Sequence, residues 1–416
     1  MKLIFHKNKH RFYKNHFGGS FYFTTTWEQR KLSDVADYRN GKAHEQDISE
    51  NGNFVVINSK FVSTSGEVYK YSLKQNEPLF ENEIAFVLSD VPNGKALAKT
   101  FLVPKSGKYT LNQRIAGITP HSDIAPYYLY TIMNRNKYFL SFDDGAKQTN
   151  LSIDDVKKFE EFYPLLKEQN KISCLLMNLD NLITLHQRKY EKFINVKKAM
   201  LEKMFPQGSD KTPKIRFKGF TDTWEQCKLG EIGNTYTGLS GKSKEDFGHG
   251  NAQFVTYMNV FSNPISNPKS IEYVEIDNRQ NKVLYGDIFF TTSSETPEEV
   301  GMSSIWLENK ENTYLNSFCF GYRLNDNTNI NLHYLAYMLR APQFRSNMVL
   351  LAQGISRYNI SKNKAMEISI DIPKHKSEQE KIGTILYQLD NLITLHQCEC
   401  EKLKNIKKAC LEKMFV

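Results

Sequence analysis

Two short clusters combine amides with cations, the side chains with which proteins read the edges of bases, and one of them adds an aromatic ring. One cluster is Gly145-Ala146-Lys147-Gln148-Thr149-Asn150, and the other is Gly354-Ile355-Ser356-Arg357-Tyr358-Asn359. Arginine and lysine match guanine edges or phosphates, and asparagine or glutamine matches adenine. The candidates for DNA contact are therefore Lys147, Gln148, Asn150, Arg357, Tyr358 and Asn359. The alternative is that the asparagines only start a turn or a helix.

Isolated cations form a second, weaker group of candidates for DNA contact. Most surface lysines are simply solvated, so each of these residues alone is a weak signal. The members of this group are Lys42, Lys60, Lys95, Arg114, Lys242 and Lys244.

Motifs for catalysis, metal binding or cofactor binding are missing or degenerate. Gly238 and Gly241 are separated by two residues, whereas a phosphate-binding P-loop needs four. His396, Cys398 and Cys400 suggest a metal cluster, but a thiolate site wants further ligands at suitable spacing. Asp287 followed by a Glu-Asn-Lys run imitates a nuclease only loosely. We therefore expect no catalytic residue, no metal site and no bound cofactor in this chain.

The chain repeats itself at a period of about 200 residues. Residues 26–32 (TWEQRKL) return at 223–229 with one change, and residues 179–187 (LDNLITLHQ) return unchanged at 389–397. Residues 197–205 return at 407–415 with one change. Between these segments the copies diverge almost completely. This pattern predicts two different recognition heads on one repeated frame, and the alternative is duplication followed by neutral drift.

The repeated segments carry apolar residues in alternating steps of three and four, which is typical of a coiled-coil seam. Because such a seam cannot stay exposed, we expect the two helices to pack against each other within the chain, in antiparallel orientation. The alternative is that each helix packs only on its own neighbouring block. The predicted helix- and subunit-packing positions are Ile172, Leu175, Leu179, Leu182, Ile382, Ile385, Leu389 and Leu392.

These features predict a mixed α/β (α+β) fold with two globular recognition domains, two long helices and a pseudo-twofold repeat. Short apolar runs around residues 55–57, 84–88, 254–257 and 288–291 predict strands, and residues 127–138 and 332–344 predict helices. The predicted segments are an atypical N-terminal segment (1–25), block 1 (26–164), the first long helix (165–205), a linker (206–223), block 2 (224–377) and the second long helix (378–416).

Charge and hydropathy limit the classes of partner. The 416 residues carry a net charge of +9, yet block 1 has 17 Lys/Arg against 18 Asp/Glu and block 2 has 15 against 16. A basic chain suggests a polyanionic partner, but a nucleic-acid surface on either block must be a local patch. No apolar run approaches the roughly 18 residues of a membrane span, and the apolar N-terminal patch is too short for a secretion signal. We expect a cytoplasmic protein.

The whole arrangement resembles the specificity subunits of type I restriction–modification systems. Each block opens with a Trp-Glu-Gln-x-Lys-Leu segment, starting at Trp27 and Trp224, and closes with a proline, Glu-Gln and Lys-Ile run into the repeated helix. Both helices end in Leu-Glu-Lys-Met-Phe, and residues 213–220 resemble the lead-in to a recognition domain. Residues 1–25 depart from the pattern, because they lack such a lead-in before Trp27.

The resemblance implies a non-catalytic subunit that binds double-stranded DNA. In this family each block reads one half of a bipartite site, while the helices set the spacing and dock two methyltransferase subunits. Restriction-translocase subunits complete the complex, and S-adenosylmethionine, ATP and Mg are expected on the partners. Two other classes stay open from the residues alone. They are a self-sufficient DNA methyltransferase or nuclease, and a coiled-coil scaffold that binds only proteins.

Overall fold

The computed structural model describes residues 3–5, 11–14, 20–22 and 27–414, and it divides into two compact units. Unit 1 contains the chain up to Thr184 together with the C-terminal segment from Glu401, and unit 2 spans Leu185–Cys400. Each unit therefore holds one predicted block and a portion of both long helices. In the N-terminal segment, the described residues form three short antiparallel strands. They are β1 (Leu3–Phe5), β2 (Arg11–Lys14) and β3 (Ser20–Tyr22).

Block 1 is built on a four-stranded antiparallel sheet in the order β10-β8-β12-β5. A three-stranded sheet, β11-β6-β7, shares an apolar cluster with the four-stranded sheet. Two short strand pairs, β13-β9 and β14-β4, complete the block. Strand β8 is buried at all four positions, as expected of a central strand with an unbroken apolar run. The elements are β4 (Glu28–Lys31), η1 (Leu32–Asp34), β5 (Ala36–Asn40), β6 (Phe54–Ile57), α1 (Ser59–Ser63), β7 (Tyr71–Ser72), β8 (Ile84–Val87), β9 (Ser89–Asp90), β10 (Thr100–Leu102), β11 (Tyr109–Leu111), β12 (Ile115–Pro120), α2 (Pro126–Met133), α3 (Lys137–Leu140), β13 (Thr149–Asn150), α4 (Ile153–Lys157) and β14 (Glu160–Tyr163).

Block 2 repeats this topology strand for strand. Its sheets have the orders β21-β19-β23-β16, β22-β17-β18, β24-β20 and β25-β15, and only β17–β22 pairs in parallel, as does β6–β11 in block 1. The elements are β15 (Glu225–Lys228), α6 (Leu229–Ile232), β16 (Gly233–Thr237), η2 (Lys244–Asp246), β17 (Phe247–Val255), α7 (Tyr257–Ser262), β18 (Ile271–Val274), β19 (Ile288–Thr291), β20 (Ser293–Ser294), η3 (Pro297–Glu299), β21 (Ser303–Ile305), β22 (Thr313–Leu315), β23 (Cys319–Leu324), α8 (Leu332–Met338), α9 (Pro342–Leu350), β24 (Tyr358–Asn359), α10 (Lys362–Met366) and β25 (Ser369–Ile372).

The strands predicted from apolar runs correspond to β6, β8, β17 and β19, but both helices predicted in the blocks are interrupted. In block 1 the break lies between α2 and α3, where Arg135 adopts a left-handed backbone with φ 56°. In block 2 the break precedes Pro342, which begins α9. Proline has no N–H to donate and clashes with the preceding turn, so it starts a helix more readily than it continues one.

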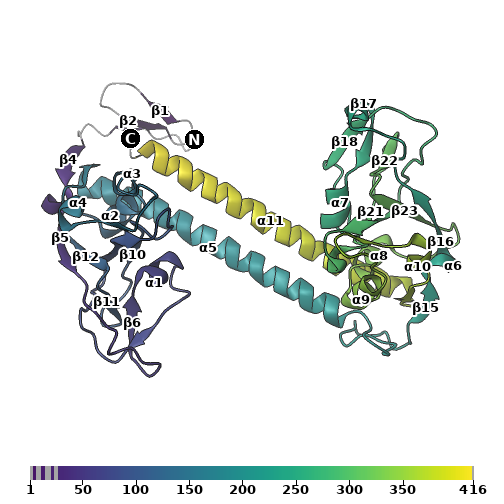
Figure 1. Cartoon of the computed structure of the whole chain (residues 1–416), viewed down its shortest axis with the longest axis horizontal. Helices are drawn as coiled ribbons and strands as arrows, with labels where there is room; N and C mark the ends of the chain where they lie inside the picture. The colour runs from purple at the N-terminus through teal and green to yellow at the C-terminus, as the bar shows by residue number, and fades with distance from the viewer. Residues whose placement is uncertain (1–2, 6–10, 15–19, 23–26, 415–416) are drawn as a thin grey trace. The chain divides into compact units, whose positions relative to one another are not determined.

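The two long helices, α5 (Leu166–Lys203) and α11 (Lys376–Met414), pack antiparallel, as predicted (Figure 1). Inside unit 2, Lys197 of α5 pairs with Asp390 of α11, and His186 meets His396. Inside unit 1, Lys407 of α11 donates to both carboxylate oxygens of Asp180 at 2.6 and 2.8 Å. Residue numbers rise on one helix as they fall on the other, which establishes the opposite directions. None of the described helices is long and apolar enough to cross a membrane.

The predicted helix- and subunit-packing positions differ in burial. Ile172, Leu179, Ile382 and Leu389 are buried, and Ile385 is partly buried.

Leu175, Leu182 and Leu392 are instead 42%, 43% and 36% exposed, whereas Leu176 and Leu386, next to Leu175 and Ile385, are fully buried. The reason is geometric. The first turns of each helix pack on the core of their own block, where the 3.6-residue period of a single helix applies, rather than on a continuous coiled-coil seam. The alternative prediction, that each helix packs on its own block, therefore holds for these turns.

Candidate nucleic-acid interface

The second polar cluster forms a short hairpin at the edge of a recess in block 2. Strand β24 pairs with β20, and Gln353 and Asn359 exchange backbone hydrogen bonds of 2.9 and 2.8 Å. The guanidinium of Arg357 lies over the Phe318 ring, 5.4 Å from its centroid. The recess has a volume of about 690 Å³, and its lining is Tyr257, Met258, Phe261, Ser293, Ser294, Glu295, Glu299, Phe318, Ser356 and Arg357.

Three predicted contact residues of block 2 lie on this hairpin. Arg357 and Asn359 are exposed, and Tyr358 is half-buried. Because the backbone of Asn359 is already bonded to Gln353, its side chain is the part that can meet a ligand. Sequence reasoning identified the hairpin but missed the other wall of the recess, which α7 and Phe318 supply.

The first polar cluster occupies the corresponding place in block 1. Strand β13 pairs with β9, and Asp144 accepts hydrogen bonds from the backbone N–H groups of Ala146 and Lys147 at 2.9 and 3.3 Å. These bonds hold the loop in a fixed turn. Lys147, Gln148 and Asn150 are all exposed, and the Gln148 amide donates to Asn150 at 3.1 Å. The structure thus presents all three predicted side chains on one loop.

Three of the weaker candidates in block 1 are exposed. Lys60 lies on α1, and Lys95 lies in the loop after β9, where the nearby Asn93 side chain donates to the backbone of Gly145. Arg114 lies between β11 and β12, and its backbone oxygen accepts from Leu88 just before β9. Lys95 and Arg114 are therefore placed near the end of block 1 that carries β9 and β13.

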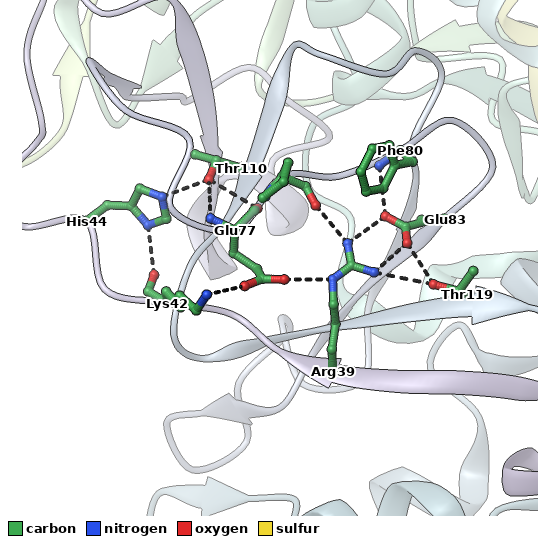
Figure 2. A network of polar contacts seen from close by, with 9 residues as sticks. Arg39, Lys42, His44, Glu77, Phe80, Glu83, Thr110 and Thr119 are labelled. Atoms are coloured by element: carbon green, nitrogen blue, oxygen red, sulfur yellow. Dashed lines mark hydrogen bonds and ion pairs between the residues drawn. The ribbon is translucent and has the colours of Figure 1, made fainter.

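Lys42 is anchored in a network of polar contacts (Figure 2). Its ammonium lies 3.0 Å from Glu77, which also pairs with Arg39 at 2.9 Å. Arg39 forms a two-pronged ion pair with the buried Glu83. Burial raises the pKa of Glu83, but the hydrogen bonds from Arg39, Phe80 and Thr119 outweigh it and lower the pKa overall. Glu77 therefore partly neutralises Lys42, which weakens its candidacy for a phosphate contact.

Block 2 keeps the buried carboxylate but takes the arginine from a different strand. Asp287, at the position of Glu83, receives two hydrogen bonds of 2.7 Å from Arg323 and one of 2.7 Å from the Tyr236 hydroxyl. Arg39 of block 1 lies on β5, whereas Arg323 lies on β23, the counterpart of β12. Asp287, the aspartate of the degenerate nuclease-like pattern, is thus held in an ion pair with Arg323.

The two remaining lysines of block 2 differ in exposure. The Lys242 ammonium lies 3.2 Å from Asp277 and its side chain is mostly covered. Hydrogen bonds from Arg279 first, and then from Lys242, hold the pKa of Asp277 well below its usual range. Lys244 is exposed. Neither lysine corresponds to Lys42. The residue equivalent to Lys42 is Leu239, because Leu239 donates its backbone N–H to Leu315 as Lys42 does to Leu111. Lys42 and the two lysines of block 2 therefore occupy different positions in the repeated frame.

Among the described residues, no three His, Cys, Asp or Glu side chains gather where they could hold a metal ion. His396 contacts His186 and stacks on Phe193, at 5.6 Å between ring centroids. In the described residues, each block thus presents an exposed polar rim, formed by the loop at 145–150 in block 1 and by the hairpin at 354–359 in block 2. The rim of block 2 also carries aromatic rings. Such rims can recognise a surface, but they contain no assembled catalytic group.

A chain of two such blocks, each joined to a long helix, defines a class of bipartite recognition subunit. Residues 24–193 and 221–405 match the family described as the type I restriction modification DNA specificity domain, so the chain belongs to that family. It is the DNA-recognition subunit of a type I restriction–modification system, and such subunits are non-catalytic.

Named relatives cover nearly the whole chain. The type I restriction enzyme MjaVIII specificity subunit of Methanocaldococcus jannaschii is 23% identical, with 92% of this chain and 90% of the relative aligned. The putative MjaX specificity subunit of the same organism is also 23% identical, covering 92% and 91%. The S subunit of a type I system from M. genitalium shares the fold, with a TM-score of 0.57, 18% identity and coverage of 94% and 97%.

Proposed function

We propose that block 1 and block 2 each read one half of a bipartite site on double-stranded DNA. The observation that carries this proposal is that the two blocks have the same strand order but different side chains on the corresponding rims. A shared frame docks on the duplex in the same way twice, while the exchanged side chains select different bases. The two half-sites are therefore unlike in sequence.

The contacts to DNA come from the exposed rim residues of each block. In block 1 these are Lys147, Gln148 and Asn150, supported by Lys60, Lys95 and Arg114. In block 2 they are Arg357, Tyr358 and Asn359, supported by Lys244. Lys42 and Lys242 contribute less, because Glu77 and Asp277 already pair with them.

The long helices dock the catalytic partners, two copies of a methyltransferase subunit, with restriction-translocase subunits joining them. The repeated sequence LDNLITLHQ leaves a leucine pair exposed on each helix, Leu182 and Leu185 on α5 and Leu392 and Leu395 on α11. Two identical apolar surfaces fit two copies of one partner better than two unrelated partners. S-adenosylmethionine, ATP and Mg belong to those partners.

A block exchange tests the proposal. Residues 27–164 would be replaced by the corresponding block of another specificity subunit, and the methylated sequence would be mapped in cells by sequencing modified adenines. We expect one half of the recognised sequence to change and the other half to stay, because each block folds around its own core. A change in both halves, or in neither, would refute modular recognition.

A further inference from the structure

The rim of the recess in block 2 is apolar where the rim of block 1 is cationic or small. Met258, Phe318 and Ile355 are 60%, 52% and 95% exposed. Their structural counterparts in block 1 are Lys60 on the equivalent short helix, Arg114 before the equivalent strand, and Ala146 in the equivalent loop. Large apolar side chains so exposed on a folded domain indicate a surface that meets a partner.

Two carboxylates face the same recess and restrict what it can accept. Glu295 is exposed, and Glu299 is half-buried with its carboxylate accepting from the Ser294 hydroxyl at 3.0 Å. Against them stands one cation in the lining, Arg357, whose guanidinium already lies over Phe318. A wall with two carboxylates and one guanidinium repels phosphate groups, so the recess is suited to base edges rather than to the DNA backbone.

The major-groove edge of one base pair combines the two features that this rim complements. A thymine presents its C5-methyl group, and the adenine paired with it presents an N6 amino donor. The methyl group suits Met258 and Phe318, and the amino group suits a carboxylate such as Glu295. A cytosine offers the amino donor without the methyl group, and a guanine offers acceptors that a carboxylate would repel.

Resting on the proposed function of the two blocks, we infer that the recess of block 2 reads a thymine–adenine pair in the major groove through the thymine methyl group. Block 1 reads its half-site by hydrogen bonds from Lys147, Gln148 and Asn150, and thymine methyl groups contribute little there. The two halves of the site are thus recognised by different chemistry on the same frame.

Replacement of thymine by deoxyuridine tests this inference, because it removes only the methyl group. The site is first mapped by sequencing modified adenines, and the chain is purified with its bound subunits. Binding is then measured on duplexes with deoxyuridine at each thymine of one half-site at a time. At about 0.8 kcal/mol per buried methyl group, we expect at least one position in the block 2 half-site to lose about fourfold in affinity, and none in the block 1 half-site.

A matched pair of variants links the effect to the recess. Phe318→Ala should abolish the difference between thymine and deoxyuridine duplexes. Leu350→Ala, at an exposed leucine of α9 outside the recess, should leave that difference intact. Specific binding with no loss on deoxyuridine, or with equal losses in both half-sites, would overturn the inference alone. Absence of specific binding to the unmodified duplex would instead overturn the proposed function, and this inference with it.

Discussion

At the scale of single residues, the blocks depend on a buried carboxylate that each must neutralise. Glu83 and Asp287 occupy equivalent positions, yet their arginines come from different strands, Arg39 on β5 and Arg323 on β23. A buried carboxylate without its partner is costly, because the charge stays out of water with little compensation. Each block therefore keeps an arginine beside its buried carboxylate, although the arginine comes from a different strand in each block.

Replacement of Arg323 should lower the stability of block 2 strongly. Arg323→Met leaves Asp287, whose side chain is 1% exposed, with two neutral donors, the Tyr236 hydroxyl and the Leu284 backbone N–H, and no cation. We expect the free energy of unfolding to fall by about 3–5 kcal/mol, measured by urea denaturation. Arg279→Met is the control, since Arg279 is largely exposed beside Asp277 and its loss should change stability little. Equal stability of both variants would show that the Asp287 pair is not a structural requirement.

The histidine pair between the long helices should make unit 2 sensitive to acid. Burial lowers the pKa of His396, and the neighbouring His186 and Lys189 lower it further. A histidine whose folded pKa lies below its unfolded value of about 6.5 stabilises the fold above that pH, and this contribution is lost as the pH falls below it. Thermal melts should show a fall in Tm from pH 7.5 to 5.5 that is smaller for His396→Gln than for the wild type. The same fall in both proteins would contradict this assignment.

Sequence reasoning at this scale identified exposed cations but not their partners. Lys147 and Arg357 were predicted from local composition, and the structure presents both on exposed loops. The pairing of Lys242 with Asp277, and the exposed Phe318 and Met258, depend on residues brought together from distant parts of the chain. No local sequence pattern predicts tertiary contacts of this kind.

At the scale of elements, the long helices were predicted from their repeat, but in their first turns the fully buried residues are Leu176 and Leu386, one position after the predicted Leu175 and Ile385. The identical segments and their apolar periodicity were sufficient for the helices and their opposite directions. A heptad pattern assumes a partner helix along the whole length. The first turns instead face a globular core, where Leu176 and Leu386 are fully buried.

A pair of leucines on α11 distinguishes packing from docking. Leu386→Ala should lower the free energy of unfolding by about 2–5 kcal/mol, because the side chain is fully buried in the core of unit 2. Leu392→Ala should leave urea denaturation nearly unchanged, since that residue is partly exposed, yet weaken binding of the methyltransferase subunit in a pull-down titration. Loss of stability in the Leu392 variant with normal binding would assign this surface to the fold instead.

At the scale of the whole molecule, one type of contact ties each block to both helices. Asp180 of α5 receives the Tyr127 hydroxyl from α2 and the Lys407 ammonium from α11. In unit 2, Asp390 of α11 receives the Tyr337 hydroxyl from α8 and the Lys197 ammonium from α5. Each block is thus fastened to its own helix and, through a lysine, to the helix that belongs to the other repeat.

Lengthening both helices where the units divide should change the spacing between half-sites. One heptad inserted after Thr184 and one after Cys400 leaves the contacts inside each unit intact, although it moves Leu182 away from Leu185 on α5. Seven helical residues add about 10 Å with little rotation, which corresponds to up to about three base pairs. Mapping of methylated adenines should show both half-sites unchanged and a longer gap. An unchanged gap in a folded, active complex would remove the helices as the determinant of spacing.

The segment from Glu401 onward lies with unit 1, although the rest of that unit is made at the opposite end of the chain. Cys410 and Met414 are buried in the same cluster as Leu32 and Tyr128. During synthesis, the part of unit 1 that is made first lacks the apolar side chains of Cys410 and Met414 until nearly all of the chain has left the ribosome, and until then its core stays open to water and chaperones. A premature stop before Glu401 would therefore yield a product whose first half, although fully translated, is left unsealed and open to proteolysis.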